Sequence, residues 1–247
     1  MTLVRRAAAE FVGTAFLVAA VIGSGIAASR LSPGQVGLQL LENSLATGFV
    51  LFALIVALQP VSAAFNPLVT LVERAFGTIT TPDAAALVGV QLAGGIVGAI
   101  VANVMFGLDP VTIATHHRSG GGLWLGEAVA TLGLLVVIFG AVRTGRANAV
   151  AGAVGTYIAA AYWFTSSTSF ANPAVTIARV FSNTFAGIAP VSVPMFVVMQ
   201  LVGGVAAFGL ITLLYPERAL YPGWAARAAD VVDAEPHGAP VLPTTWS

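Results

Sequence analysis

The chain has 247 residues, of which 57% are hydrophobic types and only 8% are charged, whereas an ordinary soluble domain carries about 25% charged residues. Ten basic residues balance ten acidic ones, so this composition excludes a soluble enzyme, a disordered regulator and a nucleic-acid-binding protein. Cysteine is absent, which excludes disulfides and thiolate metal sites.

Apolar segments run almost from end to end and predict a single membrane domain over residues 1–215, followed by a polar cytoplasmic tail over 216–247. A membrane-spanning helix needs roughly 20 apolar residues. In chain order we expect six spans, at about 8–29, 38–58, 84–107, 123–142, 148–166 and 192–214. Two further helices, at about 66–76 and 172–182, are too short to cross alone. The sequence therefore predicts an all-α membrane protein with six transmembrane helices and two re-entrant half-helices.

The positions of the arginines predict the orientation, because cytoplasmic loops carry an excess of basic residues. With the N-terminus inside, the cytoplasm receives Arg5, Arg6, Arg74, Arg143, Arg146, Arg218 and Arg227. The outside then receives Arg30, Arg118 and Arg179. An even number of spans places both termini in the cytoplasm.

Three local patterns occur twice in the same order. They are Glu10 with Thr14 and Glu127 with Thr131, Asn66-Pro67 and Asn172-Pro173, and the Gln-Leu-x-Gly-Gly runs that begin at Gln91 and Gln200. The two halves, about 8–107 and 123–215, each contain three spans. Because three is odd, the second half must be inverted relative to the first, and the two Asn-Pro segments must enter from opposite faces.

The Asn-Pro pairs predict the starts of the two half-helices. Asparagine caps a helix start, and proline is favoured at the first helical position. Two helix N-termini that meet at the membrane centre place two positive dipole ends there. We expect cations to be repelled at this point, while the amides of Asn66 and Asn172 bond a passing neutral oxygen.

The duplicated halves, the paired Asn-Pro motifs and the two Glu-x-x-x-Thr helices resemble the major intrinsic proteins, the aquaporins and glycerol channels, over about residues 8–215. The resemblance implies an aquaporin-like fold, a homotetramer with one pore per subunit, and pore motifs at Asn66-Pro67-Leu68 and Asn172-Pro173-Ala174. It also implies that Glu10 and Glu127 hold the re-entrant loops. The run from Asn172 to Arg179 further resembles a bacterial branch associated with arsenic resistance, which implies a bacterial plasma (inner) membrane.

The sequence departs from this family at two positions. Leu68 stands where the family normally has alanine, and it either narrows the channel centre or packs between helices. Val175 stands where the family usually has the arginine of the outer selectivity filter. By counting along the chain, the filter implied is Thr47 (or Ala46), Ala160, Ser169 and Val175, with no aromatic and no charged side chain. Such a filter is wider and less polar than that of a water-only channel.

Arg179 lies four residues beyond Val175, on the same helix face and about 6 Å farther along the axis. Two interpretations remain open for it. It forms a displaced positive gate above the filter, or it is an outer-face arginine paired with a carboxylate or a lipid headgroup.

These features predict a passive channel for small uncharged solutes: glycerol-like polyols, neutral metalloid or methylated arsenical species, and water. The alternatives are a water-selective aquaporin, an ion-coupled secondary transporter, and a membrane protein with a blocked pore. Motifs for catalysis, nucleotide binding or metal binding are absent from the sequence, so we expect no enzyme, no cofactor and no metal. The expected partners are neutral solutes, water, the lipid bilayer and further copies of the chain, with no nucleic acid.

Overall fold

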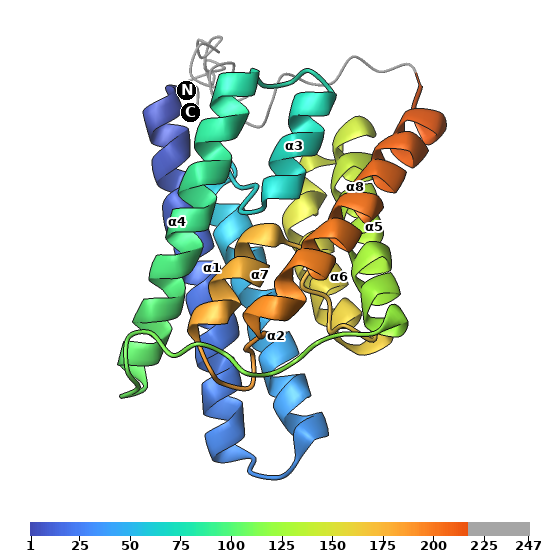
Figure 1. Cartoon of the computed structure of the whole chain (residues 1–247). Helices are drawn as coiled ribbons and strands as arrows, with labels where there is room; N and C mark the ends of the chain where they lie inside the picture. The colour runs from blue at the N-terminus through green and yellow to red at the C-terminus, as the bar shows by residue number, and fades with distance from the viewer. Residues whose placement is uncertain (217–247) are drawn as a thin grey trace, which may run out of the picture.

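The computed structural model describes residues 1–216 (Figure 1). This part of the chain contains eight α-helices and no strand. The helices are α1 (Leu3–Leu31), α2 (Val36–Leu58), α3 (Pro67–Ala75), α4 (Thr81–Met105), α5 (Gly121–Arg143), α6 (Val150–Phe164), α7 (Pro173–Ala178) and α8 (Val193–Leu214). Most of the expected tail, from residue 217 onward, lies outside the described residues.

Five of these helices are long and apolar enough to cross a membrane: α1, α2, α4, α5 and the stretch Pro190–Leu214 that contains α8. The fifth expected span in chain order, 148–166, is shorter than predicted. Its helix, α6, begins at Val150 after a 3₁₀ turn over Ala147–Ala149 and has 15 residues, which corresponds to about 22 Å. The chain leaves the helix early because it must turn back toward the centre of the molecule to begin α7.

Small residues let the long helices of each half approach closely. Helix α1 packs along α4, where a Cβ on Gly94 would lie 2.4 Å from the carbonyl oxygen of Phe11. In the second half α5 packs along α8, where a Cβ on Gly203 would lie 2.4 Å from the carbonyl oxygen of Ala128. The two halves therefore repeat the same backbone-to-backbone contact, as expected for a duplicated chain.

The half-helices α3 and α7 enter from opposite ends of the molecule and point toward one another (Figure 1). The N-terminus and the end of α8 lie at the same end, while the turn between α1 and α2 lies at the other. We call the end with the α1–α2 turn the outer end, following the orientation expected from the arginines. The long helices thus surround two short ones that meet inside the bundle.

The segment between the halves, residues 106–120, crosses the outer end beneath α7 (Figure 1). Its backbone is tied to the segment that follows α7: Ala114 donates to the carbonyl of Val180 at 2.8 Å, and Ala189 donates to the carbonyl of His116 at 2.8 Å. These hydrogen bonds therefore hold residues 106–120 against the segment that follows the second half-helix.

Candidate functional site

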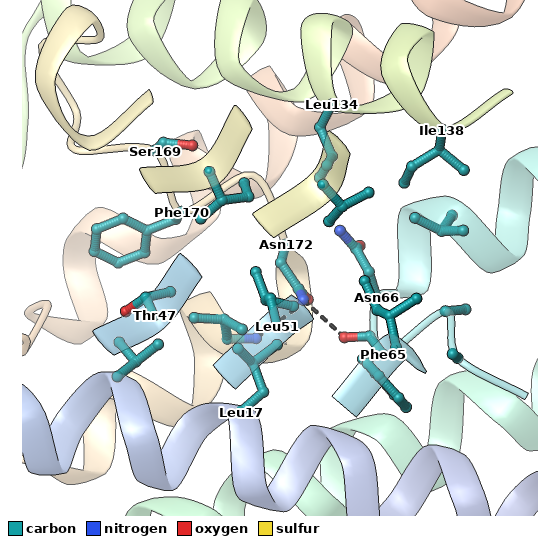
Figure 2. Close-up of a pocket in the computed structure, with 18 of the residues that line it drawn as sticks. Leu17, Thr47, Leu51, Phe65, Asn66, Leu134, Ile138, Ser169, Phe170 and Asn172 are labelled. Carbon is teal, nitrogen blue, oxygen red and sulfur yellow. Dashed lines mark hydrogen bonds between the residues drawn. The ribbon is translucent and has the colours of Figure 1, made fainter. Parts of the chain in front are cut away.

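Asn66 and Asn172 join the two half-helices tip to tip. The side-chain oxygen of each caps its own helix, accepting from Leu68 N at 2.9 Å and from Ala174 N at 2.9 Å. The side-chain nitrogen of each donates across to the other loop, from Asn66 to the carbonyl of Ala171 and from Asn172 to that of Phe65, both at 2.8 Å. Figure 2 shows the second of these bonds. The predicted meeting of two capped helix starts is present in the structure.

The two buried glutamates hold the loops that precede the half-helices. Glu10 accepts from the backbone N–H groups of Ala64 and Phe65 at 2.8 and 2.6 Å. Glu127 accepts from those of Phe170 and Ala171 at 2.8 and 3.0 Å. Both carboxylates are fully buried, so these backbone donors compensate for the loss of water.

This anchoring also explains an unusual backbone conformation. Phe65 and Ala171 have positive φ angles of 47° and 48°, a region that non-glycine residues rarely adopt. The N–H of each is held by its glutamate, and the carbonyl of each accepts from the opposite asparagine. The glutamates therefore set the positions of the carbonyls at the junction of the half-helices.

Two glutamines complete the scaffold, and sequence reasoning assigned them no role. Gln91 donates to Glu10 at 2.8 Å and to Thr70 at 2.9 Å. Gln200 donates to Glu127 at 2.6 Å and to Thr176 at 2.8 Å. The signal that marks them is the duplicated Gln-Leu-x-Gly-Gly run, whose glutamine faces the buried acid of its own half.

A cavity runs along the junction of the half-helices. The cavity has a volume of about 50 Å³. One water needs roughly 10–15 Å³ of such a volume, so a short file of about three to five waters fits. Asn66 and Asn172 lie at its middle, with Thr47, Ser169 and Phe170 toward one end and Ile138 toward the other (Figure 2). The rest of the lining is largely apolar and includes Leu17, Val21, Leu51, Leu134, Val150 and Val154.

Three of the four predicted filter residues line this cavity: Thr47, Ser169 and Val175. Ala160 does not, because it is exposed on the far side of α6. The face of α6 that reaches the cavity carries Ile158 and Tyr162 instead, which are one helical turn apart. Ala46, the alternative to Thr47, does not line the cavity either.

The expectation that this end lacks aromatic and charged side chains is therefore wrong. Tyr162, Phe170 and Arg179 all line the cavity, and the hydroxyls of Tyr162 and Thr47 are hydrogen-bonded at 3.2 Å. Counting back along the chain to Ala160 missed Tyr162 because the position at which α6 ends sets which of its residues face inward.

Arg179 is buried, with 2% of its surface exposed. Its guanidinium carbon lies 3.5 Å from the ring centroid of Phe170, and its Nε donates to the carbonyl of Ala186. It makes no salt bridge within residues 1–216, where the single ion pair joins Arg6 and Asp83. Of the two interpretations, the outer-face arginine paired with a carboxylate does not describe this geometry.

Arg118, in the segment between the halves, flanks the same ring with its guanidinium carbon 5.1 Å from the Phe170 centroid. Its Nε donates to the carbonyl of Gly187 at 3.0 Å. Burial lowers the pKa of Arg118 to about 10, although the nearby charge of Glu127 acts in the opposite direction. The guanidinium therefore stays positive at neutral pH, next to Arg179.

The remaining motif residues do not line the cavity. Leu68 is 2% exposed and faces α8, where a Cβ on Gly204 would lie 3.7 Å from its side chain. Of its two interpretations, packing between helices matches this position. Pro67, Pro173 and Ala174 form the buried first turns of α3 and α7, so these residues shape the half-helices rather than the cavity wall.

The chain matches the major intrinsic protein family over residues 1–162 and 143–237. It is 49% identical over 218 residues to the Aquaglyceroporin AqpS of Rhizobium meliloti (strain 1021), covering 87% of this chain and 93% of that protein. It is 29% identical over 237 residues to the Aquaporin Z of Photorhabdus laumondii subsp. laumondii, covering 87% of this chain and 100% of that protein. Its fold is similar to the X-ray structure of the aquaglyceroporin from Plasmodium falciparum, with a TM-score of 0.68 at 19% identity, over 87% of this chain and 98% of that one.

Proposed function

Because the chain belongs to the major intrinsic protein family, we propose that it is a passive channel for small uncharged solutes. The candidate solutes are glycerol-like polyols and neutral metalloid or methylated arsenical species, and water passes as well. The similarity to a protein named an aquaglyceroporin, at 49% identity over most of both chains, supports this class of solute.

The observation that carries the proposal is the cavity at the junction of the half-helices. Its lining offers the amides of Asn66 and Asn172, and most of the other lining residues are apolar. A solute that carries both hydroxyl groups and carbon matches this lining, because its oxygens find partners while its carbon needs none. Conduction is then single file, with hydrogen bonds exchanged along the polar groups.

The outer end of the cavity sets the size of the solute. Thr47, Ser169 and Val175 contribute small side chains, and Val175 removes the bulk and charge of an arginine at that position. Arg179, about one helical turn further along, is the displaced positive gate above them. A channel with this arrangement admits solutes larger than water while it retains positive charge at the entrance.

Charge exclusion follows from the two helix starts and from the absence of acids among the described residues that line the cavity. The N-termini of α3 and α7 face the cavity centre, and their partial positive charge repels cations, including hydrated protons. The buried acids Glu10 and Glu127 are occupied by backbone N–H groups, so they serve as scaffold. An ion-coupled transporter needs acids that exchange protons or ions along the path.

A water-selective aquaporin is the second candidate. The side chains of Tyr162, Phe170 and Arg179 at the outer end favour it, because aromatic and charged groups there narrow the entrance and make it more polar.

We also propose that the chain forms a homotetramer in the bacterial plasma (inner) membrane, with both termini in the cytoplasm and with residues 1–215 as one channel domain of two repeats. Large apolar side chains on the outside of the bundle, such as Phe49 at 70% and Val205 at 73% exposure, support burial against lipid or neighbouring subunits.

The test is stopped-flow light scattering on reconstituted vesicles that are given either a glycerol gradient or an impermeant-sugar gradient. The proposed channel shrinks the vesicles quickly in both gradients and then lets them swell again quickly in glycerol only. Fast shrinkage without recovery in glycerol identifies the water-selective alternative. A glycerol flux that follows an imposed proton or sodium gradient identifies a coupled transporter.

A further inference from the structure

The outer end of the cavity holds more positive charge than the described acids neutralise. Arg179 is buried and Arg118 is half-buried, and both lie beside the ring of Phe170. The one acid whose charge reaches both is Glu127, and its oxygens already accept from Phe170 N, Ala171 N and Gln200. Two guanidinium groups thus share one carboxylate that is already engaged, and a net positive charge remains.

The contacts that hold the guanidinium of Arg179 in place do not involve its two terminal nitrogens. Its Nε donates to the carbonyl of Ala186, and its guanidinium carbon lies over the ring of Phe170. Arg118 donates to the carbonyls on either side, of Phe185 at 3.4 Å and of Gly187 at 3.0 Å. Within residues 1–216 the two terminal nitrogens of Arg179 have no hydrogen-bond partner, although its side chain lines the cavity.

Ser169 supplies a second unpartnered group in the same cavity. The residue is 3% exposed, its hydroxyl has no hydrogen-bond partner among the described residues, and it lines the cavity next to Phe170. Buried hydroxyls are normally hydrogen-bonded, and an exception points to a missing ligand or water. A ligand that satisfies Ser169 and the fork of Arg179 together must offer at least two acceptor oxygens.

We propose that Arg179 and Ser169 form a binding site for one small, singly charged oxyanion, a carboxylate or sulfonate, at the outer end of the cavity. A guanidinium fork matches two oxygens on one atom, and the serine hydroxyl donates to one of them. Among the described residues that line the cavity, Arg179 carries the only charged side chain, so the anion is held at the outer end by this charge-assisted pair. The bound anion therefore obstructs the path of neutral solutes; this blocking effect rests on the proposed function, whereas the binding itself does not.

Binding is measured first, with methanesulfonate as the probe, because it remains a monoanion across the working pH range. The width of its methyl proton resonance is followed by NMR as purified protein is added. We expect broadening with the wild type and with Arg30→Gln, a matched control whose arginine lies at the outer end against Phe106 and does not line the cavity. Arg179→Gln weakens binding about tenfold or more, since a charge-assisted pair is lost.

Ser169→Ala keeps the measurement decisive if Arg179→Gln fails to fold, because this serine hydroxyl has no bond to lose within residues 1–216. We expect binding weaker than that of the wild type. Absence of broadening in the wild type overturns the site, as does equal broadening in the wild type and Arg179→Gln or Ser169→Ala.

The blocking effect is measured in vesicles, with sodium methanesulfonate on both sides so that the orientation of the channel does not matter. Glycerol flux falls saturably in the wild type and in Arg30→Gln, but not in Arg179→Gln, relative to sodium chloride at equal osmolarity. Flux that is present but insensitive to the probe overturns the blocking effect alone. No glycerol flux without the probe overturns the proposed function, and the NMR result still decides the binding site.

Discussion

Replacing Glu127 by glutamine tests whether the buried acids set the geometry of the path. The carboxylate is fully buried and accepts three hydrogen bonds, from Phe170 N at 2.8 Å, Ala171 N at 3.0 Å and Gln200 Nε2 at 2.6 Å. A glutamine has one acceptor oxygen. Placed at the position that serves Ala171 and Gln200, that oxygen keeps two bonds, and its NH₂ group then faces the N–H of Phe170.

The cost follows from this count. One buried N–H left without an acceptor costs about 1–3 kcal/mol, and two charge-assisted bonds become neutral ones that are each weaker by about 1 kcal/mol. Removing a buried charge offsets part of this loss, which leaves a destabilisation of about 2–4 kcal/mol. For a chain of this size, that lowers the midpoint of thermal unfolding by about 5–15 °C.

The assay is thermal unfolding of the detergent-solubilised protein, followed by glycerol flux in vesicles. Glu42→Gln is the matched control, because Glu42 lies on α2 and accepts a single bond, from Ser32 at 2.7 Å, that an amide oxygen preserves. We expect Glu127→Gln to lose both stability and flux and Glu42→Gln to lose neither. Equal midpoints and equal flux for the two variants refute the anchoring role of the carboxylate.

Three further predictions concern packing and charge. Gly98→Ala places a Cβ 2.2 Å from the carbonyl oxygen of Ala15, and the overpacking should lower the free energy of unfolding by about 1–3 kcal/mol. Gly89→Ala on the same helix meets nothing within 4 Å and should raise that free energy slightly; equal shifts contradict the close contact of α1 and α4. Leu68→Ala should cost about 2–5 kcal/mol of stability and leave the ratio of glycerol to water permeability unchanged, and a changed ratio would place its side chain in the path. Burial, with the charge of Arg118 as a smaller cause, lowers the pKa of His116 from 6.5. Because the folded state disfavours the protonated imidazole, the unfolding midpoint should fall slightly as the pH falls below 6.5, and His116→Gln should remove this dependence. An unchanged pH dependence in that variant contradicts the assignment to His116.

The sequence predicts the scaffold of this fold because both halves carry the same three motifs in the same order. The repeated Glu-x-x-x-Thr, Asn-Pro and Gln-Leu-x-Gly-Gly patterns carry the acids, helix starts and glutamines that bond to one another in each half. Their chemistry is local: asparagine and proline favour a helix start, and a buried acid needs donors. The two half-helices and their order were therefore predictable from single residues and spacing.

The outer end of the cavity was less predictable because two of its groups come from positions without a repeated motif. Tyr162 faces the cavity because of where α6 ends, and Arg118 reaches Phe170 from a segment with no regular structure. Arg179 was singled out by its spacing from Val175, yet spacing alone left its direction open. The stack on Phe170 and the bond to Ala186 set that direction, and both depend on how the outer segments fold over α7.

The most direct test of the proposed path is stopped-flow light scattering in a glycerol gradient on Val175→Arg, compared with Val111→Arg. Val175 lines the cavity, whereas Val111 lies on the outer segment with 47% of its surface exposed. If neutral solutes pass through this cavity, Val175→Arg abolishes the rapid swelling in glycerol and Val111→Arg retains it. Equal swelling in both variants would show that glycerol does not pass Val175 and would contradict the proposed path.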